Sequence, residues 1–139
     1  MMTGKYYLDS CIWRDYIENR SDRFRPLGDW AFALIKKIIQ ESCSIIYSNL
    51  VEEELLSAFD ENQIIKILSI VPDELLIKVE VKEEQLKEAI KTGKRLNLPV
   101  KDALHAIMAR DNHAILISRD KHFYELSEQM TIKKPEDLI

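Results

Sequence analysis

The chain has 139 residues, of which 46% are hydrophobic and 32% charged, and its net charge is −4, which predicts one soluble globular domain over residues 1–139. Because no apolar run reaches the roughly 18 residues of a membrane span and no signal-peptide pattern opens the chain, we expect a cytoplasmic protein. The acidic balance argues against a protein that coats nucleic acid, but not against an enzyme that acts on nucleic acid through a bound cation.

Short apolar runs alternate along the chain with segments whose apolar residues recur at helical spacing. In chain order, these patterns predict a strand at 5–8, a helix containing 12–17, a loop at 19–26, a helix at about 29–41, a strand at 44–48, a helix from 49 to about 58, a short helix at about 61–70, a strand at 75–79, a long helix through 86–96, a helix from 99, a strand at 114–117, a helical turn at 123–126, a brief strand near 131–132 and a turn at 135. Asn49 could cap the helix after the second strand, with Val51, Leu55 and Ala58 facing the core. Gly93 costs about 1 kcal/mol within a helix, which indicates a close helix contact there.

Strands that alternate with helices predict an α/β fold. The expected architecture is a three-layer α/β/α sandwich around a mostly parallel sheet of four or five strands.

Residues 98–120 predict a helix followed by a strand that is buried on both faces, with an acid near each end. Pro99 suits a first helical position, and Asp102 lies in the first turn, where the helix dipole favours an anion. Asp120 follows the strand 114–117 closely. Open α/β sheets place their sites at the carboxyl ends of the strands, so Asp120 is a candidate site residue.

Four carboxylates could converge at this edge of the sheet, because strand ends and the starts of the following helices share it. They are the side chains of Asp9 after the first strand, Glu54 one turn into the helix after the second, Asp102 and Asp120. Such a cluster is too repulsive to stay empty and ionised, so either pKa values rise or a divalent cation binds. Hard oxygen ligands of this kind suit Mg²⁺ or Mn²⁺.

Each acid also has a plain structural explanation. Asp102 could be only a helix-start acid, Asp120 only a turn residue and Glu54 one of three solvated glutamates. Asp9 is the hardest to explain in this way, because it follows a tyrosine-rich apolar run with no polar break. His105 could hydrogen-bond Asp102 one turn away, or could be a partly exposed helix residue without a catalytic part.

The motifs YLDSC, SNLVEEEL, LPVKDALHAIMA, ISRDKHF and KKPEDL, in this order, resemble a PIN domain along nearly the whole chain. DALHAIMA followed by ISRD is the most specific part of the resemblance. PIN domains are metal-dependent ribonucleases, and many are toxins of VapBC toxin–antitoxin pairs. The resemblance implies a PIN-like sheet in the strand order 3-2-1-4-5 and an acidic centre for Mg²⁺ or Mn²⁺.

The resemblance assigns the catalytic and metal-binding roles to four residues of this chain, Asp9, Glu54, Asp102 and Asp120. Glu53 is the alternative to Glu54 as the second acid. Ser10 and Ser118 match hydroxyl positions that help to hold the site.

Two positions depart from the family pattern. Cys11 stands where Asn or Ser is frequent, and His122 stands where many members have a further acid. The second departure leaves open whether the centre holds one metal ion or two.

By the same resemblance, the expected activity is endoribonuclease cleavage of an RNA substrate, which leaves 5′-phosphate and 3′-hydroxyl ends. The expected partners are an antitoxin protein and a second copy of the chain. Ile64, Ile65 and Leu68 could supply part of the homodimer interface, or could only cover the sheet. The alternative is a PIN fold that serves as a non-catalytic RNA- or protein-binding module.

Three other classes fit less well. The chain has three glycines and no glycine-rich loop between a strand and a helix, which disfavours a phosphate-binding nucleotide enzyme. A haloacid-dehalogenase-like phosphatase requires Asp-x-Asp after the first strand, and a receiver domain requires paired acids there. This chain has Asp9-Ser10-Cys11 at that place and fits neither class. Cys11 and Cys43 are too few and too isolated for a disulfide framework or a zinc site.

Overall fold

The computed structural model describes residues 4–126 and 130–139, and over these residues it contains five strands and six α-helices. The elements are β1 (Lys5–Leu8), α1 (Ser10–Ile17), α2 (Leu27–Gln40), β2 (Ser44–Ser48), α3 (Asn49–Leu56), α4 (Glu61–Leu68), η1 (Asp73–Leu75), β3 (Leu76–Val79), α5 (Glu83–Leu96), α6 (Val100–Asp111), β4 (Ala114–Ile117), η2 (Lys121–Leu126), β5 (Ile132–Lys133) and η3 (Pro135–Asp137). The strands form one parallel sheet in the order β3-β2-β1-β4-β5. The expected α/β fold and strand order are therefore confirmed. None of the described helices is long and apolar enough to cross a membrane.

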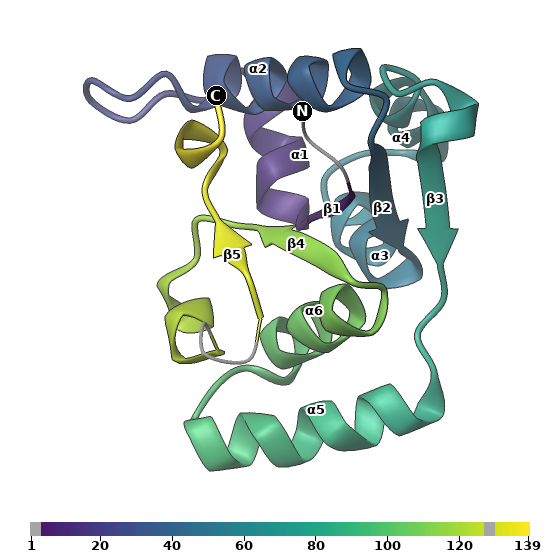
Figure 1. Cartoon of the computed structure of the whole chain (residues 1–139), viewed down its shortest axis with the longest axis vertical. Helices are drawn as coiled ribbons and strands as arrows, with labels where there is room; N and C mark the ends of the chain where they lie inside the picture. The colour runs from purple at the N-terminus through teal and green to yellow at the C-terminus, as the bar shows by residue number, and fades with distance from the viewer. Residues whose placement is uncertain (1–3, 127–129) are drawn as a thin grey trace.

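The direction of the chain across the sheet reverses at β1. The connections from β1 to β2 and from β2 to β3 run one way, whereas the connection from β3 leads back past them to β4 on the other side of β1. Because β-α-β crossovers are right-handed, α1 to α4 cover one face of the sheet and α5 and α6 cover the other. Figure 1 shows α5 and α6 together at the lower end of the molecule, with α1, α2 and α4 towards its upper end.

The central strands are buried on both faces, as expected for a parallel sheet between helices. Tyr7 and Leu8 of β1 and Leu116 and Ile117 of β4 are each inaccessible to solvent. The ladder continues past the strands, because the Asp9 N–H donates to the Ile117 carbonyl at 3.2 Å. The residues that follow β1 and β4 are thus held side by side by a rigid scaffold.

The start of α3 differs from expectation. Ser48, rather than Asn49, is the cap, because its Oγ accepts the Val51 N–H at 3.2 Å. The Asn49 side chain instead accepts the Val81 N–H at 3.0 Å, which ties α3 to the segment after β3. The helix ends at Leu56, so Ala58 lies beyond it and is exposed rather than in the core.

The close contact expected at Gly93 is made with the turn between α5 and α6 and with Val100, the first residue of α6. A Cβ atom on Gly93 would lie 2.8 Å from the Leu98 carbonyl oxygen. Asn97 ends α5 in the left-handed conformation, with φ of 56°, which returns the chain towards the helix it has just left. Pro99 occupies the cap position of α6 rather than its first helical position.

Candidate metal centre

All four candidate acids lie at the carboxyl edge of the sheet, around the point between β1 and β4 where the strand order reverses. Asp9 directly follows β1, and Asp120 follows β4 after two residues. Asp102 is in the first turn of α6, which runs antiparallel to β4 and so begins at this edge. Glu54 lies in α3, the helix that follows β2. Ligand sites of open α/β sheets occur at such reversal points.

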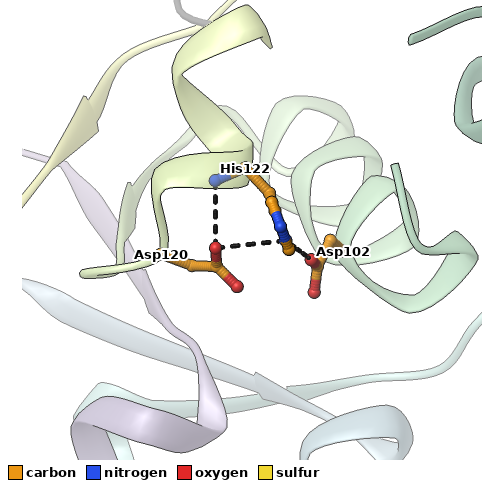
Figure 2. A group of neighbouring side chains, drawn as sticks. All are labelled: Asp102, Asp120 and His122. Carbon is orange, nitrogen blue, oxygen red and sulfur yellow. Dashed lines mark hydrogen bonds and ion pairs between the residues drawn. The ribbon is translucent and has the colours of Figure 1, made fainter. Parts of the chain in front are cut away.

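Asp102, Asp120 and His122 form a close group that could hold a metal ion. Figure 2 shows the His122 ring between the two carboxylates, with Nδ1 2.8 Å from Asp102 Oδ2 and 3.2 Å from Asp120 Oδ1. The His122 backbone N–H also donates to Asp120 Oδ1, at 2.9 Å. One ligand atom of each residue lies within 4.8 Å of the others. The hydrogen bond to Asp102 and the charge of Asp120 raise the pKa of His122 above its usual value.

Asp9 is buried next to this group, with 5% of its surface exposed. Its Oδ1 caps α1 by accepting the Ile12 N–H at 3.3 Å, and it also accepts the Cys11 thiol at 2.8 Å. Ser118 connects it to the neighbouring acid, since the Ser118 hydroxyl hydrogen-bonds Asp9 and accepts the Asp120 N–H at 3.0 Å. Burial is the largest influence on Asp9 and raises its pKa despite these hydrogen bonds.

The Cys11 thiol acts as a hydrogen-bond donor to Asp9. Burial, followed by the charge of Asp9, raises the pKa of Cys11 far above its usual value. The thiol therefore remains protonated and is a poor nucleophile, because the reactive form of cysteine is the thiolate.

The raised pKa of Asp9 leads to a prediction for the metal-free protein. Asp9→Asn keeps an oxygen that can cap α1 and removes a buried charge, so we expect the Tm in EDTA at pH 7 to rise by about 3 °C or more, equivalent to about 1 kcal/mol for a chain of this size. A carboxyl whose pKa is higher in the folded than in the unfolded protein lowers the stability of the fold as the pH increases through that folded-state pKa. The gain should therefore shrink as the pH falls towards 4 and the parent carboxyl takes up its proton.

Thermal denaturation followed by circular dichroism at pH 4 and pH 7 measures this effect. Asp9→Ala is the control, because it removes the charge and also the cap, and a lost cap costs about 1 kcal/mol. A metal-free Asp9→Asn protein that melts below the parent at pH 7 would contradict the prediction.

Glu54 is held by a chain of hydrogen bonds that runs through the core. Its Oε1 accepts the Ser10 hydroxyl at 3.2 Å and lies 2.5 Å from His105 Nε2. The other ring nitrogen, His105 Nδ1, is 2.7 Å from the Tyr7 hydroxyl, which is 2.7 Å from Ser48 Oγ. With a neutral imidazole, every O–H and N–H can donate in one direction, from Ser48 through Tyr7 and His105 to Glu54.

This chain determines the charge of Glu54. Burial alone would raise the pKa of its carboxyl, but the hydrogen bonds that it accepts, mainly the one from His105, and nearby positive charge outweigh burial and lower the pKa below its usual value. Glu54 is therefore ionised at neutral pH. The neighbouring Glu53 is exposed and lines a different surface groove, so the geometry favours Glu54 as the second acid.

The expectations for His105 were wrong on both counts. It is buried, with 2% of its surface exposed, and it contacts Glu54 and Tyr7 rather than Asp102. The available signal was that apolar residues flank His105 on both sides in the motif DALHAIMA. Nothing in the sequence marked Tyr7, because a tyrosine within a buried strand is usually part of the core.

Arg119 lies between the site residues Ser118 and Asp120 but points into a network of its own. Its guanidinium is 3.3 Å from Asp15 of α1 and 2.8 Å from the Glu136 carboxylate, and it lies over the Trp30 ring of α2 at 5.6 Å. This network joins the end of β4 to both helices and to η3.

Comparison with known proteins identifies related folds. The family model described as PIN domain matches residues 6–129, whereas no curated protein gives a significant match. The structure of VapBC2 from Rickettsia felis bound to a promoter DNA fragment has a chain that is 16% identical, with a TM-score of 0.67 over 94% of this chain and 98% of that one. The toxin–antitoxin complex from Klebsiella pneumoniae gives 16% identity and a TM-score of 0.64, over 94% and 97% of the two chains. FitAcB from Neisseria gonorrhoeae gives 14% and 0.62, over 99% and 100%.

Proposed function

The chain belongs to the PIN-domain family, and we propose that it is a metal-dependent endoribonuclease, the toxin of a VapBC-type toxin–antitoxin pair. Members of this family are typically nucleases, and the similar structures are toxins of toxin–antitoxin complexes. The observation that carries the proposal is the convergence of Asp102 and Asp120 on one point, beside the buried carboxyl of Asp9. Burying or crowding carboxylates is costly unless positive charge offsets it, and a bound dication would supply more of that charge than the single imidazole of His122.

The donor set fits Mg²⁺ or Mn²⁺, because it consists mainly of carboxylate oxygens supplied by rigid elements. Asp9, Asp102 and Asp120 would hold the ion, and Glu54 would complete the set. Once bound, the ion would lower the pKa of an attacking water and neutralise charge on the scissile phosphate.

The residues of the chain set the geometry for this chemistry. Both hydrogen bonds to Glu54 go to Oε1, which leaves Oε2 available to accept a proton from the attacking water. The Ile12 N–H and the Cys11 thiol hold Asp9 in one orientation. No side chain is proposed as the nucleophile, since the Cys11 thiol stays protonated.

The direct test is RNA cleavage by the purified protein. We expect single-stranded RNA from a mixed-sequence panel to be cut in the presence of Mg²⁺ or Mn²⁺, and EDTA to abolish cutting until either ion is restored. Analysis of the product ends should find 5′-phosphate and 3′-hydroxyl groups, because water attacks rather than the RNA 2′-hydroxyl. Cleavage that persists in EDTA, or 2′,3′-cyclic phosphate ends, would overturn the mechanism. An inactive protein that still binds RNA would support a non-catalytic binding module instead.

The proposed homodimer needs a revised interface. Ile64 and Leu68 are buried within the protomer, at 4% and 7% exposure, whereas Ile65 is 66% exposed and Leu56 is 47% exposed. The two exposed side chains line a surface groove of about 420 Å³ between α3 and α4. Exposed apolar side chains gathered in this way favour an interface.

We expect the parent to be a dimer by light scattering at tens of micromolar, and the double variant Leu56→Lys/Ile65→Lys to be a monomer with an unchanged circular dichroism spectrum. The double variant Leu86→Lys/Ile90→Lys, which changes exposed residues of α5, is the matched control and should remain a dimer. A monomeric parent would remove the proposed interface.

A further inference from the structure

We propose that His122 is a nitrogen ligand of the metal centre and makes the centre bind transition-metal dications in preference to Mg²⁺. This inference rests on the metal centre of the proposed function and specifies which ions it takes. It starts from the place of the imidazole, which lies between the carboxylates of Asp102 and Asp120 rather than beside them (Figure 2).

The distances match those between neighbouring ligands of one ion. Two donor atoms at right angles around an octahedral ion, each about 2.1 Å from it, are about 3 Å apart. His122 Nδ1 lies 2.8 Å from Asp102 Oδ2 and 3.2 Å from Asp120 Oδ1. An ion could therefore take all three atoms as ligands with little movement of the side chains.

The backbone keeps the imidazole at this place. Asp120 and His122 are separated by one residue in the segment that enters η2, and the His122 N–H donates to Asp120 Oδ1 at 2.9 Å. This hydrogen bond brings both side chains to the same side of the segment, opposite Asp102 in the first turn of α6. His122 thus approaches the two carboxylates because of the local fold, whatever its own charge.

An imidazole among the ligands changes which ions bind well. Mg²⁺ strongly prefers oxygen ligands and gives up its water reluctantly. First-row transition ions accept imidazole nitrogen, with affinities that rise from Mn²⁺ through Co²⁺ along the Irving–Williams order. A centre in which His122 joins the carboxylates should therefore discriminate against Mg²⁺ more strongly than a centre with an acid at this position.

The test compares ion binding and direct nitrogen ligation in three metal-free proteins, which are the parent, His122→Asp and His113→Asn. His113 is an exposed residue at the end of α6 in the left-handed conformation, which asparagine tolerates, so His113→Asn is the matched control. Isothermal titration calorimetry gives the Kd values for Mg²⁺, Mn²⁺ and Co²⁺. Pulsed electron paramagnetic resonance of the Mn²⁺-loaded proteins detects a coordinated ¹⁴N nucleus.

We expect the ratio of the Mg²⁺ and Co²⁺ Kd values to fall by about 10-fold or more in His122→Asp and to be unchanged in His113→Asn. The ¹⁴N coupling should be present in the parent and the control and absent in His122→Asp. If the ions bind but neither the ratio nor the coupling depends on His122, the inference is wrong while the metal centre of the proposed function stands. If none of the ions binds the parent, the metal centre itself is wrong, and the inference fails with it.

Discussion

Asp9→Asn and Asp120→Asn are each expected to slow RNA cleavage by a factor on the order of 100 or more while both proteins stay folded. Each change removes one negative charge from the proposed centre and replaces it with an amide of the same shape. Asp9 is buried beside the centre, and Asp120 is one of the two carboxylates that converge there. Initial rates at saturating Mn²⁺, with circular dichroism to verify folding, measure the loss.

The neighbouring glutamates supply a matched control for this experiment. Glu54→Gln should also lose activity, because the Glu54 carboxylate is proposed to complete the metal centre, where His105 and Ser10 hold it in place. Glu53→Gln should cleave RNA at the parental rate, because its side chain is exposed on another surface. Full activity in Glu54→Gln together with loss in Glu53→Gln would assign the second acid to Glu53 and contradict our assignment.

Arg119→Leu is expected to lower the free energy of unfolding by about 3 kcal/mol and the Tm by about 10 °C. The Asp15 carboxylate is 5% exposed and the Arg119 side chain 13% exposed. Among the residues that the structure describes, the substitution leaves this buried carboxylate with the more distant Arg20, at 3.8 Å, as its cationic partner. Burial already raises the pKa of Asp15 in spite of Arg119. Urea denaturation at pH 7 measures the change.

Two further measurements separate the lost ion pair from lost packing. An acid whose pKa is raised on folding is destabilising above that pKa, so the defect should shrink as the pH falls and Asp15 becomes protonated. Adding Asp15→Asn to Arg119→Leu should restore part of the stability, because no unpaired charge then remains buried. Arg25→Leu, which breaks the exposed pair with Asp22, should cost much less stability than Arg119→Leu. Equal losses in Arg119→Leu and Arg25→Leu would contradict the explanation.

The sequence was most informative where the backbone is buried on both sides. The strands at residues 5–8, 44–48 and 114–117 have the bounds that their apolar runs predicted. Helix ends were predicted less well, because they depend on single hydrogen bonds. Ser48 could equally have been the last strand residue and nothing more, and only its contact with the Val51 N–H shows that it caps α3.

For the candidate site too, some features could be predicted from the sequence and others depend on how the helices pack. The common edge of Asp9, Glu54, Asp102 and Asp120 follows from the order of strands and helices alone. The partner of His105 does not, because it depends on how α6 and α3 are rotated about their axes on either side of the strands. The sequence likewise left open whether Ile64 and Leu68 form an interface or cover the sheet, and only the packed structure shows that α4 turns them inward.

The central place of β1 has a consequence for how the protein folds. Lys5 pairs with Ser44 on one side and with Ala114, near the other end of the chain, on the other side. Closing so long a loop costs more conformational entropy than closing the shorter one, so β2 should join β1 before β4 does. Asp9 and Asp120 meet only when β4 is in place. A chain that has folded as far as β3 therefore carries three of the five strands but lacks the proposed centre, which would form when β4 pairs with β1.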